Sequence, residues 1–286
     1  MGVASAAVQA QQSGNRLSMR DFNRLAQFVN EYSGIKLPAS KHTMLEGRLR
    51  RRLRATGIQT FDEYCRYVFD EGGMESEFVH LVDTVTTNKT DFFREPKHFE
   101  YMLATALPAL VRDGATKIRA WSAACSTGAE PYTMAMILDA FFESRRGGSY
   151  SILATDLSTD VLEKAWLGIY PGELIEPVPA PMRKKYVMQA EDPARKDVRI
   201  VPRLRSKIGF ARHNLMDGRY NVGDKMHIIF CRNVLIYFDK DTQGKVLSRL
   251  SDCLVPGGYL FIGHSESIAG HDLPLDTVAN TVFRRK

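Results

Sequence analysis

The spacing of apolar residues divides the chain into a helical front part and a longer part in which strands and helices alternate. Between residues 17 and 86 apolar side chains recur three and four positions apart, as in Phe22, Leu25, Phe28 and Val29. This spacing is typical of amphipathic helices. The front part is therefore predicted to be a small all-α domain.

Residues that favour helix starts support this prediction. Ser18 and Ser40 are the predicted N-caps of the first two helices. Thr60 and Glu63 stand three apart before another apolar set, which predicts a capping box.

After Asp91 the apolar residues form short continuous runs of strand length. These predicted strands lie at residues 118–122, 151–155, 208–211, 227–231, 259–263 and 282–284. Helical spacing fills three of the gaps, at residues 131–142, 159–166 and 241–253. The alternation predicts an α/β fold with a doubly wound, mostly parallel sheet.

Two features interrupt this rhythm. Residues 172–207 are rich in proline and then alternate apolar and basic residues, which predicts an inserted β-hairpin. Residues 256–258, Pro-Gly-Gly, predict a turn before the strand at 259–263. The expected organisation is a flexible tail (1–16), a helical domain (17–87) and an α/β domain (88–286) with a small β-subdomain at about 172–207.

Composition narrows the function classes. The net charge is +6, no run of about 18 apolar residues could span a bilayer, and the start lacks a signal-peptide pattern. The four cysteines are too widely spaced for a metal knuckle or a disulfide framework, and no metal site is expected. The chain is expected to be cytoplasmic, without direct membrane insertion.

Polar residues follow four of the predicted strands, where open α/β sheets bind their ligands. Asp156 is placed to accept hydrogen bonds from the two hydroxyls of a ribose, and Gly128 would allow close backbone approach. The other candidates at strand ends are Glu130, Asn214, Leu215, Arg232, Asn233 and Tyr237. Neither G-x-G-x-x-G nor G-x-x-x-x-G-K occurs, so a nucleoside without phosphates is the better match. Each residue alone could be a cap or a solvated acid, but four strand ends together favour a site.

Four blocks of residues resemble the chemotaxis receptor glutamate methyltransferases, the CheR family. They are 88–95 (NKTDFFRE), 121–128 (WSAACSTG), 230–238 (FCRNVLIYF) and 263–266 (GHSE). The likeness runs from about residue 18 to the C-terminus. It implies a fold of the S-adenosylmethionine methyltransferase type, with S-adenosylmethionine as methyl donor and S-adenosylhomocysteine as product.

The resemblance also implies roles for individual residues. Glu130 would meet the methionine amino group and Asp156 the ribose. The implied cofactor-binding set is Asn88, Thr90, Arg94, Glu130, Asp156, Asn214, Leu215, Arg232 and Asn233. Arg94 and Tyr237 are the candidates for holding the substrate carboxylate. Many relatives carry two acids after the glycine, whereas here the first is Ala129.

The charge pattern predicts a docking surface. Residues 41–54 carry six basic residues against one acid, whereas residues 55–83 carry seven acids against one arginine. A polarised face fits charge-steered docking onto acidic receptor helices better than a nucleic-acid clamp. The predicted receptor-binding residues are Arg48, Arg50, Arg51, Arg52 and Arg54, and no nucleic-acid partner is expected.

In the family the β-subdomain can bind a pentapeptide tether at the receptor C-terminus through a loop with glycine. Here the corresponding residues 189–195 contain no glycine, so weak or absent tether binding is expected. Two other functions remain as alternatives: a nucleic-acid methyltransferase, and a non-catalytic cofactor-sensing docking protein.

Overall fold

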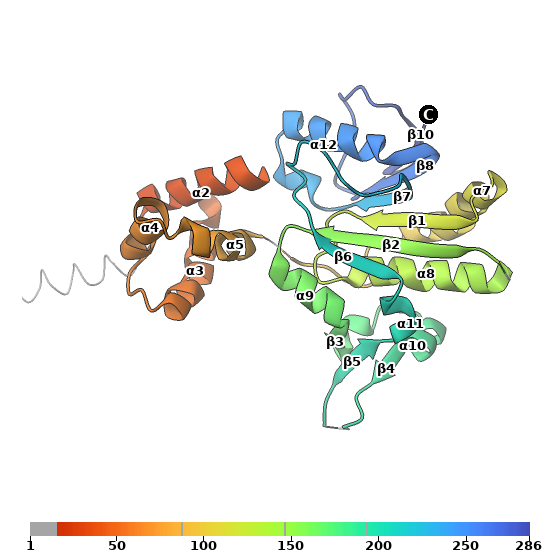
Figure 1. The fold of residues 1–286 in the computed structure, drawn as a ribbon, viewed down its shortest axis with the longest axis horizontal. Coiled ribbons are helices and arrows are strands. Elements are labelled where there is room, and N and C mark those ends of the chain that lie inside the picture. Colours follow the sequence, from red (N-terminus) through yellow and green to blue (C-terminus); the bar gives the residue numbers. More distant parts are fainter. Residues whose placement is uncertain (1–15, 87, 146, 193) are drawn as a thin grey trace, which may run out of the picture. The chain divides into compact units, whose positions relative to one another are not determined.

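In a computed structural model the chain forms two compact units, and the second begins at Asn88 (Figure 1). The structure describes residues 16–86, 88–145, 147–192 and 194–286. The predicted flexible tail therefore lies outside the described residues, except for Arg16. Each unit is described by itself below.

The first unit consists of helices around one apolar core. They are α2 (Met19–Ser33), the 3-10 turn η1 (Ala39–Lys41), α3 (His42–Thr56), α4 (Phe61–Asp70) and α5 (Met74–Val85). Each α-helix contributes an apolar stripe, and Phe22, Leu45, Tyr64 and Leu81 are at most 1% exposed. The predicted all-α domain is confirmed.

Two of the three predicted caps are confirmed. Ser18 Oγ accepts from the backbone N–H of Asp21 at 3.1 Å, and Thr60 and Glu63 form the capping box. The prediction for Ser40 is wrong. This residue lies inside η1, which runs directly into α3, so that Lys41 takes the N-cap position without a side-chain bond.

A buried polar network holds α3, α4 and α5 together. Arg52 donates two hydrogen bonds of 2.6 Å to Glu77, and the Tyr64 hydroxyl donates to the same carboxylate at 2.9 Å. Burial alone would raise the pKa of Glu77, but the bonds from Arg52 and Tyr64 outweigh it and lower that pKa. The carboxylate of Glu77 is thus a buried charge that depends on its partners on α3 and α4.

The second unit is built on a seven-stranded sheet in the order β6-β2-β1-β7-β8-β10-β9. The strands are β1 (Lys117–Ser122), β2 (Ser149–Asp156), β6 (Ile208–Arg212), β7 (Met226–Cys231), β8 (Leu254–Ile262), β9 (Leu275–Ala279) and β10 (Val282–Arg285). The first five are parallel, and β10 is antiparallel to both β8 and β9. The predicted doubly wound, mostly parallel sheet is confirmed.

Helices cover this sheet (Figure 1). They are α6 (Pro96–Tyr101), the π-turn η2 (Met102–Ala106), α7 (Leu107–Arg112), α8 (Ala129–Arg145), α9 (Thr159–Leu167) and α12 (Lys240–Asp252). α8 packs on β1 and β2 and is buried on nearly all sides, which fits the distribution of its apolar residues around the whole helix. The segment 96–112 was not predicted as a helix. Pro108 has no backbone N–H, and a π-turn precedes it.

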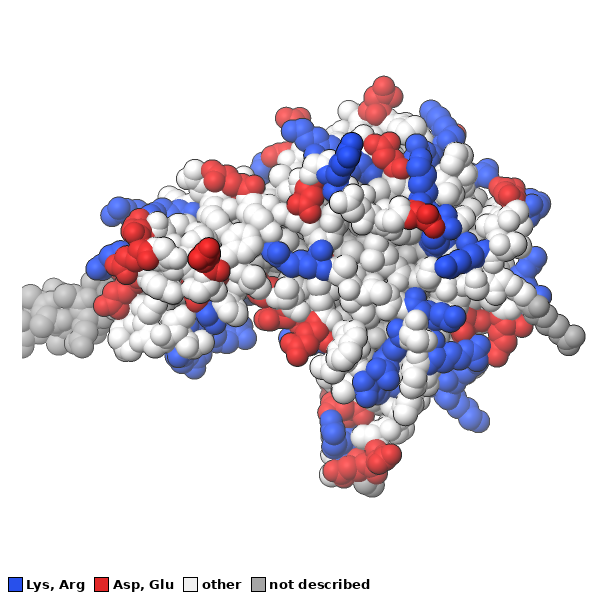
Figure 2. All heavy atoms as spheres, viewed as in Figure 1, with Lys and Arg blue, Asp and Glu red and all other residues white. Residues whose placement is uncertain are grey.

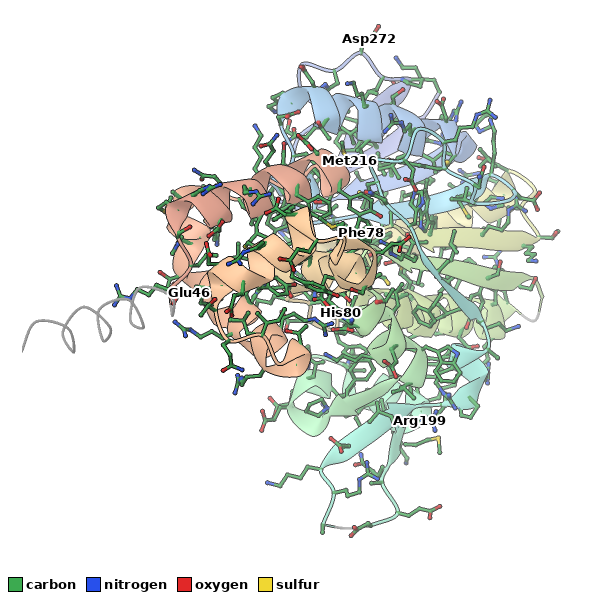
Figure 3. The ribbon with its side chains drawn as sticks, turned by 60° about the vertical axis from the view of Figure 1, so that its left-hand side comes forward. Glu46, Phe78, His80, Arg199, Met216 and Asp272 are labelled. Atoms are coloured by element: carbon green, nitrogen blue, oxygen red, sulfur yellow. The ribbon has the colours of Figure 1, made fainter. Side chains whose placement is uncertain are left out.

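The inserted segment forms a second sheet of three strands in the order β3-β5-β4. Its elements are β3 (Ile169–Pro171), η3 (Gly172–Ile175), α10 (Ala180–Tyr186), β4 (Val187–Gln189), β5 (Asp197–Ile200) and α11 (Pro202–Arg205). β4 and β5 pair as an antiparallel hairpin, but short helices flank it and β3 adds a strand from before residue 172. Figure 3 labels Arg199 on the middle strand.

The predicted turn at residues 256–258 does not precede a strand but falls within one. These residues lie inside β8, where the register with β7 shifts between Met226 and Ile228. Gly257 has φ +77 at this irregularity. One residue of β7 thus faces four residues of β8, 255–258, and the chain makes a turn-like excursion there without ending the strand.

Candidate active site

Glu130 and Arg232 meet at the point where the strand order reverses. β1 lies between β2 and β7, so the loops after β1 and β7 diverge there. Arg232 Nε donates to Glu130 Oε2 at 2.7 Å, and Ser122 Oγ donates to Glu130 Oε1 at 2.6 Å. Each oxygen retains a further lone pair. A ligand amino group could therefore reach Glu130 only by sharing these oxygens.

Arg232 makes several bonds at the carboxyl ends of the strands, and its side chain is 2% exposed. Its Nη1 donates to the carbonyl oxygen of Arg94 at 2.8 Å and to Glu95 Oε2 at 3.2 Å. The same atom lies 3.2 Å from Nδ1 of His98. The Nε and Nη1 atoms of the guanidinium thus bind groups of the protein.

His98 is buried and uncharged. Burial and the charge of Arg232 lower the pKa of His98 to about 4. The neutral ring accepts at Nδ1 from Arg232, so Nε2 carries the proton and donates to Thr281 Oγ1 at 2.8 Å. The turn between β9 and β10 is thereby joined to the site.

Glu95, His98 and His264 could by geometry bind a cation, since their ligand atoms lie within 4.8 Å of one another. The Arg232 guanidinium, however, is 3.2 Å from both Glu95 and His98. A divalent ion would have to displace this buried positive charge. The donor set therefore fits an ion-pair network rather than a metal centre.

Asp156 is held at the end of β2 with part of its surface open. Its Oδ2 accepts from the backbone N–H of Ser126 at 2.8 Å, and Oδ1 accepts from that of Ser158 at 3.0 Å. Ser126 Oγ also donates to the carbonyl oxygen of Asn88 at 2.8 Å. The loop after β1 thus connects two residues of the predicted cofactor set.

Gly128 owes its place to packing within the protein. Its φ is +93, and a Cβ there would lie 2.8 Å from the Tyr170 hydroxyl and 2.9 Å from Cβ of Ala165. These contacts within the protein are sufficient to explain why residue 128 is a glycine, whether or not a ligand approaches it.

Asn214 and Leu215 lie beyond the end of β6, and both are at most 7% exposed. Asn214 Oδ1 accepts from the backbone N–H of Met216 at 3.0 Å, and Figure 3 labels this methionine. The Tyr220 hydroxyl donates to the carbonyl oxygen of Leu215 at 2.6 Å. These bonds fix the loop and leave an apolar side chain beside an amide.

Glu266 shapes the loop after β7 by accepting four backbone hydrogen bonds. Oε2 accepts from Gly263 (2.6 Å) and Asn233 (3.0 Å), and Oε1 accepts from Leu235 (2.7 Å) and Ile236 (3.3 Å). Burial raises the pKa of Glu266, against the effect of these four donors. A Cβ at Gly263 would lie 2.6 Å from the Asn233 amide nitrogen and 2.9 Å from Glu266 Oε2.

Tyr237 ends the 3-10 turn η4 (Leu235–Tyr237), directly after the residues that Glu266 holds. Its side chain is half-buried, whereas that of Ile236 beside it is 50% exposed. The turn therefore presents a hydroxyl and an apolar group next to the strand ends.

Arg94 lies between two residues in a strained conformation. Phe93 has φ 53 and Glu95 has φ 57, in the left-handed region that only glycine adopts easily. Each such residue costs about 1 to 3 kcal/mol, and such residues cluster at functional sites. Arg94 is half-buried, and its Nη1 donates to the carbonyl oxygen of Lys89 at 3.1 Å. Thr90, half-buried as well, lies within the segment that this bond closes.

Comparison with known proteins identifies this arrangement. Residues 20–86 match the all-alpha domain of CheR methyltransferases, and residues 88–283 match the SAM binding domain of the same family. The chain belongs to the CheR methyltransferase family. It is accordingly an S-adenosylmethionine-dependent methyltransferase, and the expected type of fold is confirmed.

Relatives in the CheR family cover nearly the whole chain. The chemotaxis protein methyltransferase of Escherichia coli is 37% identical over 95% of this chain and 93% of its own length. Those of Borreliella burgdorferi (38% identical, 88% and 89%) and Salmonella typhimurium (38%, 90% and 88%) are similar to the same extent.

The described residues fit the S-adenosyl group of the CheR cofactor. Asp156 is a partly open acid oriented by two backbone donors, which suits ribose hydroxyls. Asn214 and Leu215 offer an amide and an apolar surface, which suit the edge and face of adenine. Asn88, Thr90 and Arg94 precede α6 and are each half-buried.

In the all-alpha domain the structure separates the predicted receptor-binding arginines into two groups. Arg48 donates to the carbonyl oxygens of Thr84 and Thr86 at 3.0 and 2.7 Å, and Arg52 is paired with Glu77. These two guanidinium groups are engaged inside the domain.

The other arginines of α3 are more open. Arg50 pairs with Glu46 and lies 5.3 Å from the ring of Phe61. Arg51 and Arg54 are exposed. Glu46, on the same helix, is labelled in Figure 3.

Sequence reasoning missed three residues of this CheR site: Glu95, His98 and Glu266. Glu95 and Glu266 stand inside two of the motif blocks, next to Arg94 and after the fifth parallel strand. For Glu266 the available signal was an acid shortly after a buried strand, and for Glu95 it was the place beside Arg94 in a motif block. No sequence pattern marked His98, which is reached only through tertiary contacts.

Proposed function

We propose that this protein is a cytoplasmic protein-glutamate O-methyltransferase that esterifies glutamate side chains of methyl-accepting chemotaxis receptors for sensory adaptation. The observation that supports the proposal is the fixed backbone around Arg94, a cationic residue next to the network at the strand ends. Arg94 is half-buried, its carbonyl oxygen is bound by Arg232, and its neighbours hold a strained backbone. An anionic substrate group is the natural partner of such a cation.

The chemistry of a glutamate acceptor matches the residues present. A glutamate carboxyl has a pKa near 4.3, so at neutral pH it is already a nucleophile and needs no general base. His98 is correspondingly buried and bonded at both ring nitrogens. The bound cofactor supplies the electrophilic methyl carbon.

The protein's own contribution is then positioning. Arg94 would bind the substrate carboxylate, and the Tyr237 hydroxyl would orient its second oxygen. Asp156 and the loop after β6, with Asn214 and Leu215, would hold the nucleoside end of the cofactor. Orientation of this kind contributes about 7 to 11 kcal/mol in favourable cases.

Receptor recognition is proposed to use the exposed arginines of α3, chiefly Arg51 and Arg54. Figure 2 shows a second gathering of basic side chains over the inserted β-subdomain. Residues 183–207 carry nine basic residues against three acids. The loop of the predicted tether site includes Pro193, which lies outside the described residues, and weak tether binding stays a prediction.

Among the described residues no helix is long and apolar enough to cross a bilayer.

The test is transfer of label from radioactive S-adenosylmethionine to a purified receptor cytoplasmic fragment. Mild alkali should release the label as methanol, because a methyl ester is labile. Replacing the labelled glutamates by alanine should abolish incorporation. Alkali-stable label, or label in added DNA or RNA instead, would reject the proposal in favour of an amino-group or nucleic-acid methyltransferase. Cofactor binding without transfer to any receptor would favour the docking protein.

A further inference from the structure

Glu95 joins three segments that are far apart in the chain. Its Oε1 accepts from the Asn233 side-chain amide at 3.1 Å and from the backbone N–H of His264 at 3.3 Å. Its Oε2 accepts from Arg232 at 3.2 Å. One carboxylate thus connects the Arg94 segment with the loops after β7 and β8.

The environment keeps this carboxylate charged. The side chain is 12% exposed. Burial alone would raise the pKa of Glu95, but the Asn233 amide and the Arg232 charge outweigh it and lower that pKa. At neutral pH Glu95 is therefore an anion with fixed donors on both oxygens.

The backbone at Glu95 reflects the same constraint. Its φ of 57 is unfavourable for a residue with a side chain, and the conformation persists because side-chain bonds hold it. The residue before it, Arg94, is fixed at its carbonyl oxygen by Arg232. Loosening the carboxylate should free the backbone that presents Arg94.

We propose that Glu95 is a positioning residue that holds the Arg94 side chain in register with the cofactor-binding loop at Asn233. It acts on the substrate through Arg94 and does not itself touch the reacting atoms. The inference rests on the proposed function for the identity of the methyl acceptor and for the role of Arg94 at its carboxylate.

The test variant is Glu95→Gln, which keeps the size of the side chain but removes its charge. The amide nitrogen of the glutamine can only donate, so it would face a donor in either orientation of the amide. In one orientation the bond to Arg232 would be lost, and in the other those to Asn233 and His264. We expect kcat for receptor methylation to fall about 10- to 100-fold, since misplacement of about 1 Å can cost this much. The Kd of S-adenosylhomocysteine by calorimetry should rise less than 5-fold.

A double-mutant cycle separates positioning from general structure. In an Arg94→Lys background, Glu95→Gln should lower kcat less than 3-fold further, because the contact it supports is already impaired. A loss equal to that in the wild type would overturn the proposal. Glu100→Gln, an exposed acid on α6, is the matched control and should change neither kcat nor Kd.

Hydrogen–deuterium exchange gives a readout that needs no methyl acceptor. Glu95→Gln should speed amide exchange at residues 92–95 by at least 5-fold and leave α4 unchanged. Unchanged exchange at 92–95 would overturn the proposal. A wild-type protein that fails to methylate receptors would instead reject the proposed function, while the exchange result would still decide the role of Glu95.

Discussion

Both units of this protein pair an arginine with a buried carboxylate, but the two networks differ in the backbone around them. In the helical unit, Arg52 and Glu77 join regular helices. In the methyltransferase unit, Arg232 joins loops at strand ends. Among the described residues, all non-glycine residues with left-handed backbone lie in this second unit: Phe93, Glu95, Ser126, Asn233 and Thr281.

Each of these strained residues is also close to the Arg232 network or to Asp156. Thr281 binds His98, Ser126 binds Asp156, and Asn233 binds Glu95. A buried ion pair alone is therefore a weak sign of function. A buried ion pair that holds strained loops at the strand ends is a stronger one, because the strain must be offset by surrounding bonds.

The largest effect that would test this contrast is expected at Glu266. Glu266→Ala leaves buried backbone N–H groups without acceptors, at about 1 to 3 kcal/mol each, so the methyltransferase unit should lose roughly 4 kcal/mol of stability. Both tryptophans, Trp121 and Trp166, lie in this unit, so urea unfolding followed by tryptophan fluorescence measures it directly.

The matched change in the helical unit is Glu77→Ala. It should shift the far-ultraviolet circular dichroism transition of the helical unit without altering the tryptophan transition or cofactor affinity. If Glu77→Ala weakened cofactor binding as much as Glu266→Ala, the contrast between the two networks would be mistaken.

Arg94→Ala is expected to lower kcat about 100- to 1,000-fold, which corresponds to roughly 3 to 4 kcal/mol of lost transition-state stabilisation. Cofactor affinity should change much less than kcat. Initial rates at saturating receptor and calorimetric titration with S-adenosylhomocysteine measure the two effects separately. Near-wild-type turnover at saturating substrate would remove Arg94 from the mechanism.

His98 predicts a pH dependence of stability in the methyltransferase unit. Its pKa is about 4 in the folded protein and about 6.5 when unfolded, so the unfolded chain binds more protons between these values. This contribution is fully present above pH 6.5 and is lost as pH falls toward 4, with about 2 kcal/mol lost between pH 7 and pH 5.

Glutamine can accept and donate as the neutral imidazole does, but it does not titrate. Relative to wild type, His98→Gln should therefore reduce the loss of unfolding free energy between pH 7 and pH 5, measured by tryptophan fluorescence in urea. An identical loss in both proteins would show that His98 is not the group responsible.

The smallest effect is expected at the docking surface. The double charge reversal Arg51→Glu with Arg54→Glu should raise the receptor KM about 10-fold, or 1.4 kcal/mol, with cofactor affinity intact. The difference should shrink as salt rises, since exposed charges are screened. The control is Arg112→Glu with Lys117→Glu. Both residues are exposed; Arg112 ends α7, and Lys117 begins β1, at the end of the strand away from the candidate site. Equal receptor KM values in both variants would remove α3 from recognition.

Much of this molecule could be predicted from its sequence because periodicity reports burial. The parallel strands carry continuous apolar runs, and the caps at Ser18 and Thr60 follow from local hydrogen bonding. Local signals placed two features incorrectly: the Pro-Gly-Gly of residues 256–258 lies within β8 and not before it, and Ser40 lies inside a 3-10 turn and does not cap α3.

The site was predictable only in part for a related reason. Residues that end a strand, such as Asp156 and Arg232, are marked by their position. Glu95 and His98 both contact Arg232. This partner lies 137 positions beyond Glu95 and 134 positions beyond His98 along the chain. The orientation of Arg232 toward Glu130 depends on strand order, which no local pattern encodes.

These long sequence separations have a consequence for folding. The bond between Arg232 and Glu130 spans 102 residues, and that between His98 and Thr281 spans 183. Contacts between such distant residues form late, because closing a long loop costs conformational entropy before the new contact stabilises the chain. Cofactor affinity should therefore appear only in the last stage of refolding, well after the helical circular dichroism signal has recovered. Cofactor binding would then indicate that the whole methyltransferase unit has folded.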